Sequence, residues 1–321
     1  MRIHAFIASV ILAFAAVGCS DAMLIELQTP GEAPPKVSAK FQAEITRLAA
    51  EGYRLKEAVE ASLDGSNQHL AATFERAKPK DPSQAYDFRI IESDGRTAKT
   101  IFQRSEYFFS FDASGEEAKL NATDINGDGL KEVIVQSSSG GNCWSCNPVE
   151  IYRVSNHKGE LIAAAPIQKI ADLNGDRIAE LVVTDGRWEL YEDFSHAASP
   201  SAAIVYTWRD GRYVYASRDF PAFYKDEVDR LRASIEEAKA EITADEFSDE
   251  IYVGHAVSLA ITLTHMGEMD RAIKELETLM SSNAKSPEQR KRRKTVLTDF
   301  QAGESAKKLR EMKHGDPMPL G

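Results

Sequence analysis

Two short acidic segments carry the residues of this sequence that are best suited to bind a metal ion. The first reads DINGDGLKEVIV at residues 124–135, and the second reads DLNGDRIAELVV at residues 172–183. Each segment places acidic or amide side chains at alternate positions, a glutamate at the ninth, and a short apolar run directly afterwards. Calcium takes about six to eight oxygen ligands and tolerates irregular geometry, so a short loop of this composition suits it.

The two loops offer matching sets of oxygen ligands, with water completing the shell. In the first loop the predicted ligands are Asp124, Asn126, Asp128, the carbonyl of Leu130 and Glu132. In the second loop they are Asp172, Asn174, Asp176, the carbonyl of Ile178 and Glu180. Arg177 stands where the first loop has Gly129, and a non-glycine residue in a left-handed conformation costs about 1 kcal/mol or more. We therefore expect the second calcium site to be the weaker one.

Two other interpretations of these loops compete with calcium binding of this kind. An EF-hand needs an acidic residue at the last position of its loop, where this chain has Val135 and Val183. Asp, Asn and Gly also form tight turns through side-chain hydrogen bonds alone, without any metal. The repetition of the whole pattern favours calcium over plain turns at both positions.

The spacing of the two loops and the β-type run after each one resemble the FG-GAP or VCBS repeats of integrin-type β-propellers. The resemblance covers roughly residues 100–215 and implies loops that link strands within or between propeller blades. A closed propeller has about four or more blades, whereas only two such loops are recognisable in the sequence. We therefore expect a partial propeller, or an open sheet of blade-like hairpins.

The order of the predicted elements indicates an α+β fold, an antiparallel β-meander followed by a helical region. Between residues 86 and 220, runs rich in β-formers alternate with turn pairs such as Asp-Gly. The clearest hairpin covers residues 204–217, with Asp210-Gly211 as its turn. Apolar residues recur at helical spacing from Ala39 to Ala61, with a stop or kink at Glu51-Gly52, so residues 39–85 are predicted to hold a helical segment and the start of the β-domain.

Residues 221–321 have the apolar spacing of amphipathic helices. One stripe consists of Val228, Leu231, Ile235, Ala238 and Ile242, and two shorter helical patterns are split at Met266-Gly267. The second part resembles a tetratricopeptide repeat on Leu259, Ala260, Leu263, Gly267, Ala272, Leu276 and Leu279, with a weak second unit around Ala306. The resemblance implies a helical hairpin with a concave face for a peptide or protein segment, and a plain helical bundle is the alternative.

Cys143 and Cys146 form a CxxC pair in a glycine-rich loop between two predicted strands. A redox-active pair of this spacing normally opens a helix, whose N-terminus lowers the thiol pKa, and no helix is predicted here. A structural disulfide is therefore favoured over a catalytic dithiol. A zinc site needs about two more ligands, and the sequence offers no second pair.

The N-terminus has the features of an export signal, with Arg2 followed by an uncharged apolar run. The residues AVGC that end at Cys19 resemble the lipobox of bacterial lipoproteins, which implies a signal peptide of residues 1–18 and lipidation of Cys19; ordinary cleavage after Ala22 is the alternative. Residues 19–38 are rich in proline and predicted to be a flexible spacer. The resemblance implies a cell-envelope protein on a lipid anchor, on the outer membrane if the bacterium has one.

The remaining sequence limits the class of function. The formal net charge of −11 and the pI near 5.3 argue against nucleic-acid binding. The histidines follow no metal-ligand spacing, and no phosphate-binding loop or nucleophile elbow is present, so no catalytic residue is predicted. We expect a non-enzymatic, calcium-stabilised lipoprotein that binds another envelope protein or peptide. An envelope thiol oxidoreductase using Cys143 and Cys146, or the accessory domain of a secreted hydrolase system, remains an alternative.

Overall fold

The computed structural model of this protein describes residues 35–111, 120–282 and 284–319. These residues form antiparallel sheets followed by C-terminal helices, which confirms the predicted α+β class. The predicted signal peptide of residues 1–18, the lipidation site Cys19 and most of the spacer of residues 19–38 lie outside the described residues.

The β-region consists of three four-stranded sheets in which the strand order follows the chain and every neighbouring pair is antiparallel. Sheet 1 contains β1 (Tyr53–Ala61), β2 (Gln68–Arg76), β3 (Tyr86–Ser93) and β4 (Ala98–Glu106). Sheet 2 contains β5 (Phe108–Ser110), β6 (Val133–Ser138), β7 (Val149–Ser155) and β8 (Lys158–Ala165). Sheet 3 contains β9 (Ile167–Ala171), β10 (Glu180–Thr184), β11 (Ala203–Arg209) and β12 (Arg212–Tyr215).

Sheet 2 is buried on both of its faces. Val133 and Val135 of β6 share a core with Phe88 of sheet 1. Ile134, between them, shares a different core with Leu181 of sheet 3. Side chains alternate between the two faces of a strand, so an unbroken apolar strand such as VIV needs a partner on each side. The three sheets therefore stack face to face in chain order.

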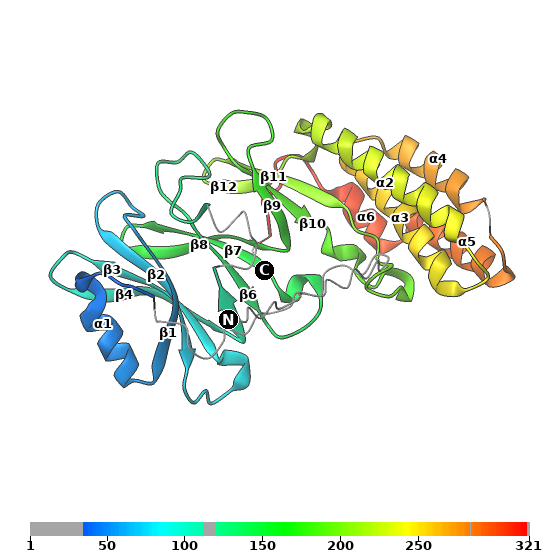
Figure 1. Ribbon diagram of the computed structural model, residues 1–321. Helices are drawn as coiled ribbons and strands as arrows, with labels where there is room; N and C mark the ends of the chain where they lie inside the picture. The colour runs from blue at the N-terminus through cyan, green and yellow to red at the C-terminus, as the bar shows by residue number, and fades with distance from the viewer. Residues whose placement is uncertain (1–34, 112–119, 283, 320–321) are drawn as a thin grey trace, which may run out of the picture. The chain divides into compact units, whose positions relative to one another are not determined.

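Helices cover the two outer faces of this stack (Figure 1). Helix α1 (Ala39–Ala50) packs Phe41 and Leu48 against Leu70 of sheet 1. On the far face of sheet 3, Val205 packs against Tyr224 of helix α2 (Pro221–Glu241). Both end sheets thus bury the face that the middle sheet does not cover.

The prediction of helical spacing up to Ala61 is wrong beyond residue 50. Helix α1 ends at Ala50, next to the predicted stop, and Gly52 has a positive φ of 91° that turns the chain into β1. A β-bulge lies between Leu55 and Glu57 and shifts the strand register. Because of this bulge, apolar residues of β1 fall at mixed spacings that imitate a helix.

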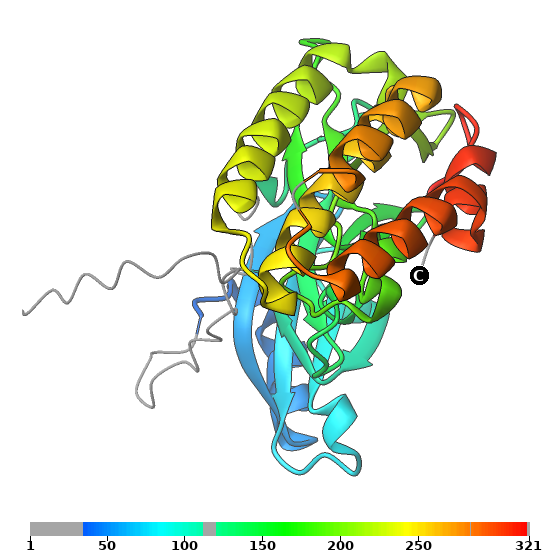
Figure 2. The same cartoon turned by 90° about the vertical axis from the view of Figure 1, so that its right-hand side faces the viewer.

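The C-terminal helices are α2, α3 (Glu246–His265), α4 (Met269–Met280), α5 (Pro287–Ala302) and α6 (Glu304–Glu311), drawn from yellow to red in Figure 2. The predicted break between two helices is present, where Gly267 has a φ of 86°. The helical core includes Trp188, Tyr191 and Phe194, which come from the segment between β10 and β11. The helices therefore build their core on a segment of the β-region.

Asp185, directly after β10, is a buried acid that lies close to helix α3. Its buried carboxylate accepts hydrogen bonds from Arg187 Nε (2.7 Å) and Trp188 Nε1 (3.0 Å), and lies 3.6 Å from His265 Nε2. Burial alone would raise the pKa of Asp185, but the hydrogen bonds it accepts and the positive charge of Arg187 outweigh this effect. The pKa of this carboxyl is therefore held well below its usual range.

We predict that Asp185→Asn lowers the free energy of unfolding at pH 7 by about 3 kcal/mol, because it leaves buried donors without a charged acceptor. A carboxyl with a lowered pKa stabilises the fold above its unfolded pKa of about 3.9, and this contribution is lost as the pH falls below that value. The difference between parent and variant should thus shrink below about pH 4. Urea unfolding at several pH values measures it, with the exposed Asp226→Asn as control. Equal stability of Asp185→Asn and parent at pH 7 would contradict the prediction.

Candidate metal-binding loops

The two acidic loops occupy the same place in two sheets. Residues 124–132 lead into β6, the second strand of sheet 2, and residues 172–180 lead into β10, the second strand of sheet 3. All ten residues predicted as ligands lie in these two loops, five in each. Within each loop, however, the oxygens of the three acidic side chains do not all lie within 4.8 Å of one another, so the predicted ligands share a loop without converging on one point.

The first acidic loop is closed by hydrogen bonds from its own backbone. Asp124 accepts N–H groups from Gly127 (2.8 Å) and Gly129 (3.0 Å). Asn126 Oδ1 accepts the N–H of Asp128 (2.9 Å), and Asp128 accepts that of Leu130 (2.9 Å). These bonds hold the chain in a tight turn whose side-chain oxygens are gathered on one short segment.

The second acidic loop repeats the same bonds at the same positions. Asp172 accepts the N–H groups of Gly175 (2.6 Å) and Arg177 (2.8 Å). Asn174 Oδ1 accepts the N–H of Asp176 (2.9 Å), and Asp176 accepts that of Ile178 (2.8 Å). Arg177 has a φ of 73°, which confirms the predicted left-handed conformation at this position.

Each loop ends on a fully buried glutamate. Glu132 Oε2 accepts the N–H of Ile125 (2.9 Å), and Glu180 Oε2 accepts the N–H of Leu173 (2.9 Å). Burial raises the pKa of Glu132 to about 8; the hydrogen bond from Ile125 opposes this shift, while the nearby negative charges of Asp128 and Asp124 add to it. Burial likewise raises the pKa of Glu180. Glu132 lies directly before β6 and Glu180 is the first residue of β10, so each glutamate closes its loop where the following strand begins.

Sheet 1 contains a third loop of the same kind at residues 62–69, which the sequence analysis missed. Gly65 has a φ of 74°, and Asp64 Oδ1 accepts the N–H of Ser66 (2.9 Å), as Asn126 and Asn174 do in the acidic loops. The N–H of Leu63 donates to Nδ1 of the buried His69 (3.3 Å). His69 therefore takes the place of the terminal glutamate.

A short signal in the sequence could have revealed this third copy. LDGS at residues 63–66 matches INGD at 125–128 and LNGD at 173–176, each an apolar residue, an acid or amide, glycine and a polar residue. The third copy has Ser62 where the others begin with aspartate, and it has no glutamate at its end. It thus keeps the shape of the loop but has fewer oxygen ligands.

Backbone hydrogen bonds join the three loops to one another. The N–H of Lys131 donates to the carbonyl of Leu63 (2.9 Å), which connects the loop of sheet 2 to the loop of sheet 1. The N–H of Ala179 donates to the carbonyl of Ile125 (2.7 Å), which connects the loop of sheet 3 to that of sheet 2. Lys131 and Ala179 hold the same position in their loops, so the connection is repeated along the stack.

Asp64, His69 and Glu92 form the one group of three acidic, histidine or cysteine residues in the described chain whose ligand atoms all lie within 4.8 Å. Burial lowers the pKa of His69 despite the charges of Asp64 and Glu92, so its ring is neutral at neutral pH. Because Nδ1 accepts the N–H of Leu63, the ring proton lies on Nε2, 3.6 Å from Glu92. A metal needs the Nε2 lone pair, so this geometry favours a histidine held between carboxylates over a metal site.

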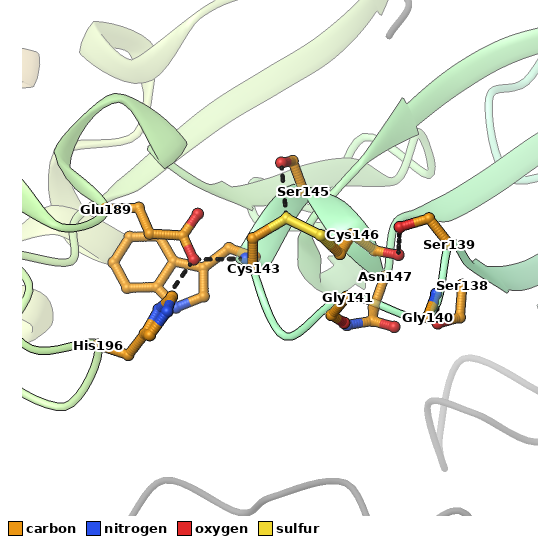
Figure 3. Close-up of a disulfide and its surroundings, with 11 residues drawn as sticks. Ser138, Ser139, Gly140, Gly141, Cys143, Ser145, Cys146, Asn147, Glu189 and His196 are labelled. Atoms are coloured by element: carbon orange, nitrogen blue, oxygen red, sulfur yellow. Dashed lines mark hydrogen bonds and ion pairs between the residues drawn. A yellow bond between two sulfur atoms is a disulfide. The ribbon is translucent and has the colours of Figure 1, made fainter.

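Cys143 and Cys146 are joined in a disulfide in the loop between β6 and β7 (Figure 3). Residues Trp144–Cys146 form a single 3₁₀ turn, and the N–H of Trp144 donates to Glu189 (2.8 Å) beyond β10. A Cβ atom at Gly141 would lie 2.5 Å from Cys146 Sγ, so the bridge requires glycine there. The turn offers no extended helix to lower a thiol pKa.

The helical region has a hollow of about 540 Å³ on α2, α3 and α4. It is lined by Arg232, Ile235, Glu236, Leu259, Arg271, Lys274, Glu275, Thr278 and Leu279. Glu275 accepts hydrogen bonds from Arg232 (2.9 Å) and Arg271 (2.8 Å) and so ties α2 to α4 across it. This hollow is the helical groove of the protein.

No model of a known protein family matches the chain, and a comparison with curated proteins finds no significant match. Among the described residues, no helix combines the length and the hydropathy needed to cross a membrane.

We predict opposite effects for two substitutions at matching loop positions. Gly129 has a φ of 85°, and the space that the Cβ atom of an alanine would occupy is open. Gly129→Ala should therefore lower the free energy of unfolding by about 1 kcal/mol through backbone strain alone. Arg177→Gly should raise it by up to about 1 kcal/mol by removing that strain. Urea midpoints of the two variants and the parent, measured with a chelator present, test both signs. If the Gly129→Ala variant is more stable than the parent, residue 129 does not have the left-handed backbone conformation on which the prediction depends.

Proposed function

We propose that the two acidic loops bind calcium and that the bound ions stabilise the stack of sheets. The ligands in this proposal are Asp124, Asn126, Asp128, the Leu130 carbonyl and Glu132 in one loop, and Asp172, Asn174, Asp176, the Ile178 carbonyl and Glu180 in the other. The observation that carries the proposal is the repetition of one hydrogen-bonded loop, with three acidic side chains and an amide, at the same place in two sheets.

The donor set fits a hard cation. Each acidic loop brings two aspartates and one buried glutamate within nine residues, and Asp128 has one cationic neighbour, Arg153, at 3.2 Å. Oxygen donors of this kind suit calcium, which also tolerates the irregular geometry of a short loop. Each Asp124 oxygen accepts one hydrogen bond from the loop backbone and keeps a second lone pair for an ion, whereas Asp172 Oδ1 accepts three such bonds. The loop of sheet 1 lacks the first aspartate and the last glutamate, so we propose no calcium site in that loop.

The stacked sheets also support the resemblance to FG-GAP or VCBS repeats as a proposal. In this proposal each four-stranded sheet corresponds to one propeller blade, with its loop between the first and second strands. The stack ends after three sheets, and α1 and α2 cover the faces where a closed propeller has further blades. The protein is then a propeller fragment capped by helices.

The calcium proposal predicts a rise in melting temperature when millimolar calcium replaces a chelator, because binding to the native state adds to stability. A site at about 100 times its Kd adds about 2.7 kcal/mol. Asp124→Asn and Asp172→Asn should each remove part of the calcium-dependent rise, and the double variant should remove nearly all of it. The Asp124→Asn effect should be larger, because Arg177 weakens the second loop.

Asp64→Asn provides the matched control for this experiment, since it changes the same kind of loop in sheet 1. Its calcium-dependent rise should equal that of the parent. Identical melting temperatures of the parent with calcium and with chelator would rule the proposal out.

We further propose that the protein acts at the bacterial cell envelope, anchored through lipidated Cys19, and that its helical region binds a protein or peptide partner. The helical groove supports this, because it combines the partly buried Leu279 with charged side chains on two helices, α2 and α4. The resemblance of α3 and α4 to a tetratricopeptide hairpin is supported by Ala272 and Ala306, which are both fully buried. Such hairpins present a concave surface to peptides.

We predict that a groove variant, Lys274→Glu with Thr278→Arg, loses the envelope protein that the intact chain captures from a detergent extract. Both side chains are exposed on α4, so the change alters the groove surface without disturbing the core. Lys291→Glu on the exposed side of α5 is the control and should capture the same protein as the parent. If the groove variant captures this protein as well as the parent does, the partner binds outside the helical groove.

A further inference from the structure

A cavity of about 680 Å³ lies between sheets 2 and 3, and no residue of the acidic loops lines it. Its wall is formed by the disulfide loop, by β7, β8, β10, β11 and β12, and by the C-terminal segment from Met312 to Pro319. The volume lies within the range of about 300–1,000 Å³ that is typical of sites for small organic ligands. The cavity is thus large enough to hold a molecule of that kind.

The C-terminal segment is firmly held where it borders the cavity. The N–H of Gly315 donates to the carbonyl of Tyr215 (2.9 Å), and the N–H of Met318 donates to that of Tyr213 (2.9 Å). Pro317 forms a β-bridge with Val214, and the Met318 side chain is buried in the core between the sheets. The segment therefore extends sheet 3 beyond β12 and supplies a fixed wall.

Four of the five charged groups of the cavity wall form ion pairs with one another. Glu150 is bonded to Arg104 (2.8 Å), and Asp185 is bonded to Arg187 (2.7 Å). Asp316 accepts the backbone N–H of Lys313 (2.7 Å). Both basic side chains of the wall thus have a carboxylate partner, so an anionic ligand would have to break an ion pair, and the remaining acid, Asp316, is held by a backbone N–H.

The hydroxyl of Tyr215 is also directed into the protein. His265 Nε2 lies 3.6 Å from the Asp185 carboxylate and therefore carries the ring proton, so Nδ1 accepts the hydroxyl of Tyr215 (3.0 Å). Most of the other wall residues are apolar; they include Pro148, Ala164, Ala165, Pro166, Val183, Ile204, Met312, Pro317, Met318 and Pro319. The surface that faces a ligand is therefore mainly hydrocarbon.

We propose that this cavity binds an uncharged small molecule with a largely apolar body. The size of the cavity, its hydrocarbon wall and the pairing of its charged groups together select this class of ligand. The site lies apart from the acidic loops, so the proposal is independent of calcium binding and is tested with a chelator present.

The probe for this site is N-phenyl-1-naphthylamine, an uncharged molecule whose fluorescence rises in apolar surroundings. Titration of the full chain should show one saturable site. Ala164→Phe, which fills the cavity, should weaken binding at least tenfold. Ala98→Phe, which changes a partly buried alanine on sheet 1, should leave the affinity unchanged. If melting shows that Ala164→Phe is unfolded, Ala165→Leu replaces it and should weaken binding in the same direction.

The anionic analogue 1-anilinonaphthalene-8-sulfonate tests the selectivity, because it has similar rings and a negative charge. It should bind at least tenfold more weakly than the uncharged probe. Equal or tighter binding of the anionic probe would show an unpaired cation in the cavity and overturn the proposed ligand class. No saturable binding of the uncharged probe, or unchanged binding in both cavity variants, would overturn the site itself.

Discussion

The burial of sheet 2 on both faces is the constraint on which the rest of this structure depends. Val133 and Val135 point to one neighbouring sheet and Ile134 to the other, so neither face is stable without its partner. Each such side chain contributes about 1.5–3 kcal/mol when it is removed from water. The outer faces of sheets 1 and 3 then need cover in turn, which α1 and α2 provide.

The loops set the positions of the sheets within this stack. Apolar packing alone allows neighbouring sheets to slide, whereas the bonds from Lys131 to Leu63 and from Ala179 to Ile125 fix their relative positions at one edge. The buried side chains of His69, Glu132 and Glu180 close the same loops from inside. The edge that carries the acidic side chains is therefore also the edge that aligns the sheets, and an ion bound there would act on the whole stack.

Local spacing predicted the two acidic loops, the hairpin at Asp210-Gly211 and the helix break at Gly267, because each depends on residues close together in the chain. The third loop was not predictable in the same way, since Ser62 and His69 replace its acidic ends and its closing residue comes one position earlier. Because of the bulge after Leu55, the apolar residues of β1 have a spacing that predicts a helix instead of a strand. The stacking order and the cavity arise from contacts between residues far apart in the sequence, which no local pattern records.

Amide hydrogen exchange at Lys131 and Ala179, followed by NMR, tests most directly whether the loops hold the sheets together. Both N–H groups donate to a neighbouring loop, so they should exchange only when the molecule unfolds globally, with a free energy close to that of unfolding. The amide of Asp210, in the exposed turn between β11 and β12, provides the fast reference. Exchange at Lys131 and Ala179 as fast as at Asp210 would contradict a stack that is joined through its loops.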